Sequence, residues 1–273
     1  MCFSYLYLEQ WSEQQERTMK TYERMTLQEA ERHIKRRVEE RVRYGESEAL
    51  LHKGEALMAL MEKALRGEAT EADMKPIVEK FSNKHWMRRF YTAVVSWALY
   101  SKEYISSVRR LTHELGGAAG VIEVCAGSGL LRAENWVCTD AVDGGLDALE
   151  AIEVHEDREV LFASWIPYQS ELDYQLTQRW VVEQGKPFLL LGEWNGCTGS
   201  QIFWEKSDVE YRVLCNDEIR EKWPWFRDVP QWDGLNDETY LVLPLREEDY
   251  DLEVPGARFV CPACGCTQEE CEC

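Results

Sequence analysis

From Ala118 onward, short apolar runs rich in β-branched and aromatic residues alternate with helical or turn segments, and this alternation constrains the fold most. Strands separated by helical connections are typical of a mainly parallel sheet covered on both faces, since parallel neighbours need a crossover. The clearest helix, residues 170–185, lies between the third and fourth strands, and the loop-like stretch before the last strand predicts an antiparallel pair at one edge. The predicted strands cover residues 121–125, 135–140, 159–165, 187–194, 209–215 and 239–245.

The N-terminal part has a different pattern, with apolar residues at helical spacing from Thr26 to about Leu115. Capping residues and glycines mark the helix ends. The expected bounds are Thr26 to Gly45, Ser47 to Gly67, a start at Thr70 with Asp73, and two further helices ending at Gly116. We predict an all-α N-terminal domain over residues 1–117, an α/β domain over residues 118–255 and a Cys-rich tail over residues 256–273.

Charge separates the same two parts of the chain. Residues 1–117 carry 20 Lys and Arg against 18 Asp and Glu, whereas the remainder carries 11 against 32, so the net charges are +2 and −21. A surface this acidic repels a phosphate backbone unless a local basic patch outweighs it, which argues against nucleic acid as a partner. A well-solvated acidic surface accounts for the charge without any partner.

The start of the chain, MCFSYLYLEQW, has no basic region and only a short apolar run, so we expect no secretory signal. No stretch reaches the roughly 18 apolar residues that a membrane span needs. We therefore expect a cytoplasmic protein with no membrane association. In that compartment the ten cysteines are expected to be thiols or metal ligands rather than disulfides.

The stretch VIEVCAGSG, residues 121–129, leads from a predicted strand directly into a run of small residues. A strand, a small-residue loop and a turn toward a helix form an arrangement in which backbone N–H groups approach a nucleotide-like ligand at the carboxyl edge of a sheet. Gly127 and Gly129 permit that approach because they carry no Cβ. Asp140 ends the next strand, where a carboxylate can accept both hydroxyls of a ribose.

In order along the chain, EVCAGSG, TDAV, LDALEA and SWIPY resemble the elements of Rossmann-like, class I S-adenosylmethionine-dependent methyltransferases, in a branch with an SW-x-PY element. The resemblance covers residues 120–245 and implies a Rossmann-like methyltransferase sheet, mostly parallel with an antiparallel edge. It also implies the binding of S-adenosylmethionine. The implied cofactor residues are Glu123, Ala126, Gly127 and Gly129 at the methionine part, Asp140 at the ribose, and Asp147 with Ala148 beside the adenine.

SWIPY, residues 164–168, resembles the Pro-Pro-Tyr element of amino-group methyltransferases, in which a polar side chain and a carbonyl accept hydrogen bonds from the target nitrogen. Trp165 and Ile166 differ from that element, so the expected acceptor is Ser164 or a main-chain carbonyl. Ser164, Pro167 and Tyr168 are the implied catalytic residues, and they would act by orienting the target nitrogen for in-line displacement.

A later segment, residues 192–205, is similar to a Gly-Glu then Gly-Cys-Thr-Gly segment of the same superfamily. Its place after a strand puts it over the mouth of the expected site. Glu193, Asn195 and Thr198 are the polar groups that would touch substrate there. A glycine-rich turn without a chemical role is the alternative.

The chain ends CPACGCTQEECEC. Cys261-Pro-Ala-Cys264-Gly has the shape of a zinc knuckle, whose tight turn brings two thiolates to one metal. Cys266, Cys271 and Cys273 are close enough in sequence to supply the two further ligands of a tetrahedral site. We expect zinc at Cys261, Cys264, Cys271 and Cys273, and the alternative is a tail of free thiols.

The favoured function is methyl transfer from S-adenosylmethionine to a small-molecule or protein substrate, with the helical part capping the site. Two other classes stay open. One is a protein that binds the cofactor without turnover and acts as a sensor or docking module. The other is an acidic interaction protein with a zinc-binding tail.

Overall fold

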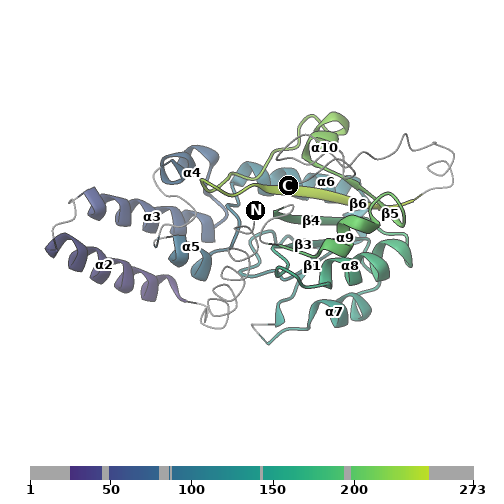
Figure 1. The fold of residues 1–273 in the computed structure, drawn as a ribbon, viewed down its shortest axis with the longest axis horizontal. Helices are drawn as coiled ribbons and strands as arrows, with labels where there is room; N and C mark the ends of the chain where they lie inside the picture. Colours follow the sequence, from purple (N-terminus) through teal and green to yellow (C-terminus); the bar gives the residue numbers. More distant parts are fainter. Residues whose placement is uncertain are drawn as a thin grey trace, which may run out of the picture.

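The computed structural model describes residues 25–44, 49–79, 86, 88–141, 144–193 and 198–245 of the chain. This part of the chain is a mixed α/β protein, as the sequence predicts, with helices at one end and a six-stranded sheet at the other (Figure 1). Within the described ranges, no helix is both long enough and apolar enough to cross a bilayer.

The strands of the sheet lie in the order β2-β1-β3-β4-β6-β5. Their bounds are β1 Val121–Val124, β2 Trp136–Cys138, β3 Val160–Ser164, β4 Phe188–Glu193, β5 Tyr211–Leu214 and β6 Asp237–Pro244. β1 pairs in parallel with β2 on one side and with β3 on the other, so the order of strands reverses at β1. All six predicted strands are confirmed, although most are shorter than predicted because the ends of the apolar runs leave the ladder.

β6 runs antiparallel to both of its neighbours, β4 and β5. The predicted mostly parallel sheet with an antiparallel edge is therefore confirmed. One element between β5 and β6 was not predicted: helix α10, Asn216–Lys222, follows β5 directly. This helix is too short to display a helical period in the sequence, and its buried residues are Asn216 and Ile219.

The N-terminal helices that the structure describes are α2 Leu27–Arg43, α3 Ala49–Leu65, α4 Glu71–Val78 and α5 Arg88–Val94, called here the helical region. The predicted caps at Thr26 and Thr70 are confirmed, since each hydroxyl accepts a hydrogen bond from the backbone of the acid three residues later. Gly67 has the left-handed backbone that ends α3 as predicted. The end predicted at Gly45 and the cap predicted at Ser47 lie outside the described residues.

Helix α6, Lys102–Glu114, is followed by Gly116 in a left-handed conformation, which confirms the predicted end. This helix falls within the region predicted as a helical domain, yet it packs against the sheet. Its Tyr104 and Leu111 share one buried core with Phe162 of β3, and α10 covers the same face. Packing therefore does not separate α6 from the α/β part of the chain.

The opposite face of the sheet is covered by helices that follow β2, β3 and β4 (Figure 1). The predicted helix over residues 170–185 is confirmed in outline, but its second half is a π-helix and it stops before Gly185, whose φ is +70°. The helices on this face are α7 Ala148–Val154, α8 Leu172–Leu176 with its π-helical continuation Thr177–Val182, and α9 Gln201–Lys206. Elsewhere, a short 3-10 turn, Gly117–Ala119, precedes β1.

The helical region packs against the loops at the carboxyl ends of the parallel strands (Figure 1). Trp232, in the loop before β6, is fully buried in the core of the helical region, and the Tyr91 ring of α5 meets it edge-on at 5.4 Å. Leu130, in the turn after β1, contacts both this core and the core under the sheet. The two parts of the molecule therefore meet where ligands bind in open parallel sheets.

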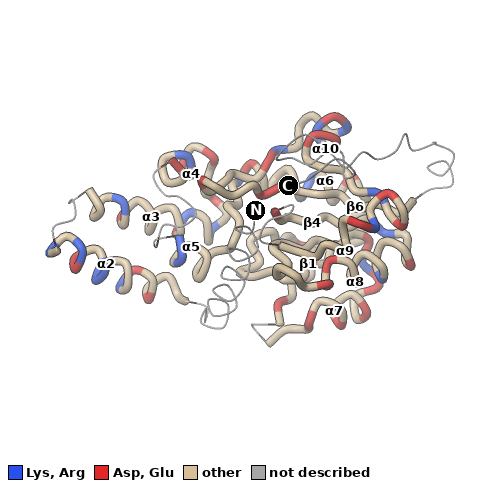
Figure 2. Tube along the Cα trace, in the orientation of Figure 1, with Lys and Arg blue, Asp and Glu red and all other residues tan. Residues whose placement is uncertain are grey.

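The charge difference between the two parts is visible in the structure. Figure 2 shows Lys and Arg interspersed with Glu along α2, and Glu on α7, one of the helices that cover the sheet.

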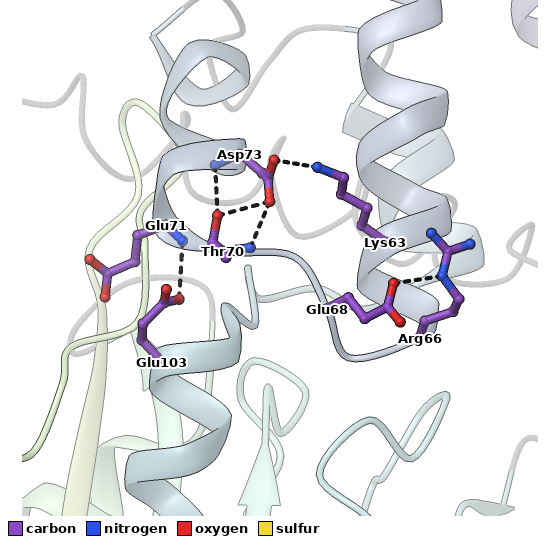
Figure 3. A network of polar contacts seen from close by, with 7 residues as sticks. All are labelled: Lys63, Arg66, Glu68, Thr70, Glu71, Asp73 and Glu103. Atoms are coloured by element: carbon purple, nitrogen blue, oxygen red, sulfur yellow. Dashed lines mark hydrogen bonds and ion pairs between the residues drawn. The ribbon is translucent and has the colours of Figure 1, made fainter.

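A polar network holds α3, α4 and α6 together (Figure 3). The Asp73 carboxylate accepts hydrogen bonds from the Lys63 ammonium at 2.6 Å and from the Thr70 backbone N–H at 3.0 Å. Glu103 of α6 accepts a hydrogen bond from the Glu71 backbone N–H at 3.1 Å. The hydrogen bond from Lys63, followed by those from Thr70, lowers the pKa of Asp73 to about 2 from an ordinary value of 3.8.

We predict that Asp73→Asn lowers the free energy of unfolding by about 1–2 kcal/mol at pH 7, because it weakens a helix cap and removes a partly exposed ion pair. An acid whose pKa is lowered in the folded state stabilises the fold above its ordinary pKa and loses that contribution as the pH falls. The difference from the wild type in urea unfolding should therefore shrink below about pH 4. Glu68→Gln, which removes the exposed pair with Arg66, is the control and should cost less than about 0.5 kcal/mol. A difference that does not change with pH would contradict the role of Asp73.

Candidate functional site

The candidate site lies at the carboxyl ends of β1 and β2, where the strand order reverses. In open α/β sheets, a ligand binds in the crevice outside the carboxyl ends of the strands at such a reversal. The helical region reaches this edge directly, since the Ser128 hydroxyl of the turn after β1 donates a hydrogen bond to the Val95 carbonyl at 2.5 Å. The site is therefore bounded by the sheet on one side and by the residues that follow α5 on the other.

A pocket of about 290 Å³ opens at this place. Gly127 and Gly129 have φ values of +57° and +64°, so the turn after β1 uses the left-handed conformations that glycine adopts without strain. The structure thus brings together four of the predicted cofactor residues, Ala126, Gly127, Gly129 and Asp140. The lining residues are Ala126, Gly127, Ser128, Gly129, Arg132, Cys138, Thr139, Asp140 and Gly145.

Asp140 follows β2 and is fixed against the glycine turn. Its Oδ2 accepts a hydrogen bond from the Gly127 backbone N–H at 2.9 Å. Backbone hydrogen bonds from Thr139 to Glu123 and from Ala126 to Thr139 continue the pairing of the two segments past the end of β2. The carboxylate therefore stands in the pocket wall at a position set by both loops.

Two residues at this edge have strained backbones. Cys125 follows β1 with φ +52°, and Trp165 follows β3 with φ +53°. β1 and β3 are in register through Val124 and Ala163, so the two strained residues start neighbouring loops. Such a conformation costs about 1–3 kcal/mol in a residue other than glycine, and it is found most often at binding and catalytic sites.

Glu123 does not line the pocket but lies buried directly beneath it. The Cys138 thiol, which does line the pocket, donates a hydrogen bond to Glu123 Oε2 at 3.1 Å. Burial raises the pKa of Glu123 to about 7, although the hydrogen bond from Cys138 and the charge of Arg132 lower it in part. Cys138 therefore lies between Glu123 and the pocket in which Glu123 was predicted to contact a ligand.

Asp147 and Ala148 begin helix α7 and lie outside the lining of the pocket. Asp147 Oδ1 accepts hydrogen bonds from the backbone N–H groups of Leu149 and Glu150 at 3.0 and 2.9 Å, so this acid is an N-cap. An Asp immediately before an apolar helical run is the sequence signal for that role. Gly145 is the residue of this loop that reaches the pocket.

The predicted catalytic residues lie on the neighbouring strand end. Ser164 is the last residue of β3, and its hydroxyl lowers in part the pKa of the buried Tyr100 phenol, which burial raises. Pro167 is exposed and forms an antiparallel bridge with Thr198, while Tyr168 is half-buried. Ser164 therefore lies at the same edge as the pocket, one strand further along the sheet.

The segment after β4 is only partly described. The Thr198 hydroxyl accepts a hydrogen bond from the Glu193 backbone N–H at 2.8 Å, which folds this segment back on β4. Glu193 Oε1 accepts one from the Asn236 backbone N–H at 3.2 Å. Asn195, predicted as a substrate contact, lies outside the described residues.

Five lining residues were not predicted: Ser128, Arg132, Cys138, Thr139 and Gly145. Ser128 lies inside the predicted loop without an assigned role, and Arg132 carries no motif, because the place of both depends on how the turn after β1 folds. The place of Cys138 could have been inferred from the sequence. Alternation along β2 puts it on the same face as Trp136, and the parallel register pairs it with Glu123.

Among the described residues, no three or more His, Cys, Asp or Glu side chains are grouped so that they could hold a metal ion. The described cysteines Cys125, Cys138 and Cys215 are free thiols. The zinc ligands predicted in the tail lie outside the described residues, so that site stays a prediction. They are Cys261, Cys264, Cys271 and Cys273.

We predict that Glu123→Gln raises the free energy of unfolding by about 2 kcal/mol at pH 8 and changes it little at pH 5. A raised pKa means that the folded state resists ionisation of Glu123, so this side chain costs stability as the pH rises from 4.5 through about 7. Urea unfolding at the two pH values measures the effect. Glu134→Gln, at an exposed acid between β1 and β2, should show no such difference. Equal stability of Glu123→Gln and the wild type at pH 8 would contradict the burial argument.

Comparison with known proteins adds no family to this geometry. No protein-family model matches the chain, and a search of curated proteins finds no relative. The function is therefore argued from the residues themselves.

Proposed function

We propose that this chain is an S-adenosylmethionine-dependent methyltransferase with a Rossmann-like sheet. The observation that carries the proposal is the pocket at the strand reversal, with two left-handed glycines after β1 and a carboxylate after β2. The order of strands and the single reversed strand support it, since both agree with the sheet that the sequence resemblance implies. The substrate would be a small molecule or a protein.

The residues of the pocket fit the cofactor chemically. Asp140 lines the pocket and accepts a hydrogen bond from the Gly127 N–H, and a carboxylate is a group that can accept the hydroxyls of a ribose. Arg132 supplies a positive charge in the lining for the carboxylate of the methionine part. Gly129 has no side chain, and a Cβ there would lie 3.8 Å from both Arg132 and Cys138, so its absence leaves that space to a ligand.

When bound, the cofactor supplies an electrophilic methyl group. The protein then has to hold the acceptor in line with that group, and orientation of this kind accounts for most of the rate. Ser164 is the candidate for this task because it ends β3, the strand beside β1 and the pocket. The helical region packs at the same edge and would cap the site.

Binding without turnover is the second candidate, and one observation favours it. Ile166, which takes the place of a proline in the related motif, is fully buried among the residues under α8. Trp165 stacks on Trp97, with ring centres 5.4 Å apart. Neither residue supplies a carboxylate or amide acceptor, so Ser164 and the backbone would have to orient the acceptor without further help.

We predict that Asp140→Asn weakens the binding of S-adenosylmethionine by about 30-fold, which corresponds to the loss of roughly 2 kcal/mol in hydrogen bonds to a charged group. Calorimetry on the full chain measures this. Asp147→Asn is the matched control, since it changes an acid that caps α7 outside the pocket, and it should alter the affinity by less than about threefold. Unchanged affinity in Asp140→Asn, or no binding to the wild type, would refute the proposal.

Turnover distinguishes the two candidates. If the wild type binds the cofactor, its incubation with the cofactor and a pool of amines and peptides should release S-adenosylhomocysteine under the first candidate. Binding without any release supports the second.

A further inference from the structure

Three tryptophans from distant segments surround one cation where the helical region meets the sheet. The guanidinium carbon of Arg88 lies 5.6, 5.8 and 5.7 Å from the ring centres of Trp97, Trp165 and Trp232. Trp97 precedes α6, Trp165 follows β3 and Trp232 lies before β6. We call these three residues the tryptophan cage. Indole faces attract cations within about 6 Å, and cages of aromatic rings are a known way to bind alkylated ammonium groups.

A buried carboxylate faces the same space. Asp237, the first residue of β6, is fully buried, and neither oxygen of its carboxylate accepts a hydrogen bond. Burial and the charge of Glu193 raise the pKa of Asp237 to about 7, although Arg88 and the Trp165 indole lower it in part. In the sheet, Asp237 pairs with Glu193 of β4, and β4 is the neighbour of the strand that Trp165 follows.

Arg88 does not satisfy this carboxylate as a structural partner would. A guanidinium paired with a buried carboxylate is expected to donate two parallel hydrogen bonds, and Asp237 accepts none. Buried polar atoms in native proteins nearly always have partners, so the two Asp237 oxygens indicate that a hydrogen-bond donor is missing.

The tryptophan cage lies beside the proposed methyl-transfer site. Trp165 follows Ser164 directly, and Ser164 is in register with Leu191 of β4. Two residues further along β4, Glu193 is in register with Asp237 of β6. The tryptophan cage and its carboxylate are therefore at the carboxyl ends of β3 and β4, on the side of Ser164 away from the cofactor pocket.

We propose that the tryptophan cage and Asp237 bind the cationic group of a substrate, a guanidinium or an alkylammonium, in the place that Arg88 takes in this structure. The assignment of that substrate as the methyl acceptor rests on the proposed function, whereas the binding of the cation does not. Three indole faces suit a weakly hydrated cation, and the Asp237 oxygens suit its N–H groups.

Methylguanidinium chloride is the probe, titrated into the full chain at constant ionic strength without S-adenosylmethionine and followed by tryptophan fluorescence and calorimetry. Arg88→Met removes the internal cation but keeps a long apolar side chain. We expect this variant to bind the probe at least tenfold more tightly than the wild type, and Arg88→Met combined with Asp237→Asn to lose at least tenfold again. Equal binding by Arg88→Met and the wild type, or by the single and double variants, would overturn the proposal.

The unchanged chain supplies a second test in case Arg88→Met does not fold. Asp237→Asn alone should bind the probe at least tenfold more weakly than the wild type, while Asp233→Asn, at an exposed acid next to Trp232, should bind it equally well. Identical affinities in all three proteins would overturn the proposal. Asp140→Asn should bind the probe normally, so a failure of the cofactor site and a failure of the tryptophan cage are observed separately.

Discussion

The structure depends on the contact between the helical region and the carboxyl edge of the sheet. Trp232 comes from a loop of the α/β part yet is fully buried in the helical core, and Leu130 belongs to both cores. Full burial of a large apolar side chain is worth about 1.5–3 kcal/mol, so Trp232 stabilises the contact by about this amount, and the partly buried Leu130 adds to it. The same contact closes one side of the edge at which the strand order reverses.

Buried acids gather on one face of this edge. Glu123 and Asp237 each have a pKa raised to about 7 by burial, and the pKa of the buried Tyr100 phenol is raised by burial and by both of these charges. Ser164 ends β3 at the same edge, and its hydroxyl lowers the pKa of that phenol in part. An acidic, aromatic site of this kind favours a cation over a phosphate or a carboxylate. The acidic surface of the α/β part acts in the same direction, because it raises the local concentration of positively charged ligands.

The sequence was sufficient for the features that depend on local pattern. Apolar runs gave the six strands, and Thr26 and Thr70 gave the starts of two helices. Gly127 and Asp140 were each predicted as ligand contacts after neighbouring strands, and a hydrogen bond joins them in the structure. Local pattern could not assign Asp147 to a ligand rather than to the cap of α7, since one carboxylate suits both. It also could not find the tryptophan cage, whose members are far apart in the chain and meet only through packing.

Trp165 joins these features in one residue. Its left-handed backbone costs about 1–3 kcal/mol. Stacking on Trp97 returns about 0.5–1.5 kcal/mol, and the cation at Arg88 returns about 0.5–2 kcal/mol, so the two contacts together offset a cost of this size. A cationic substrate that replaces Arg88 would preserve this balance. Trp165 would then keep the strained backbone that sets the direction of the loop after β3. The binding of the substrate would in this way be coupled to the position of Ser164, the residue proposed to orient the methyl acceptor.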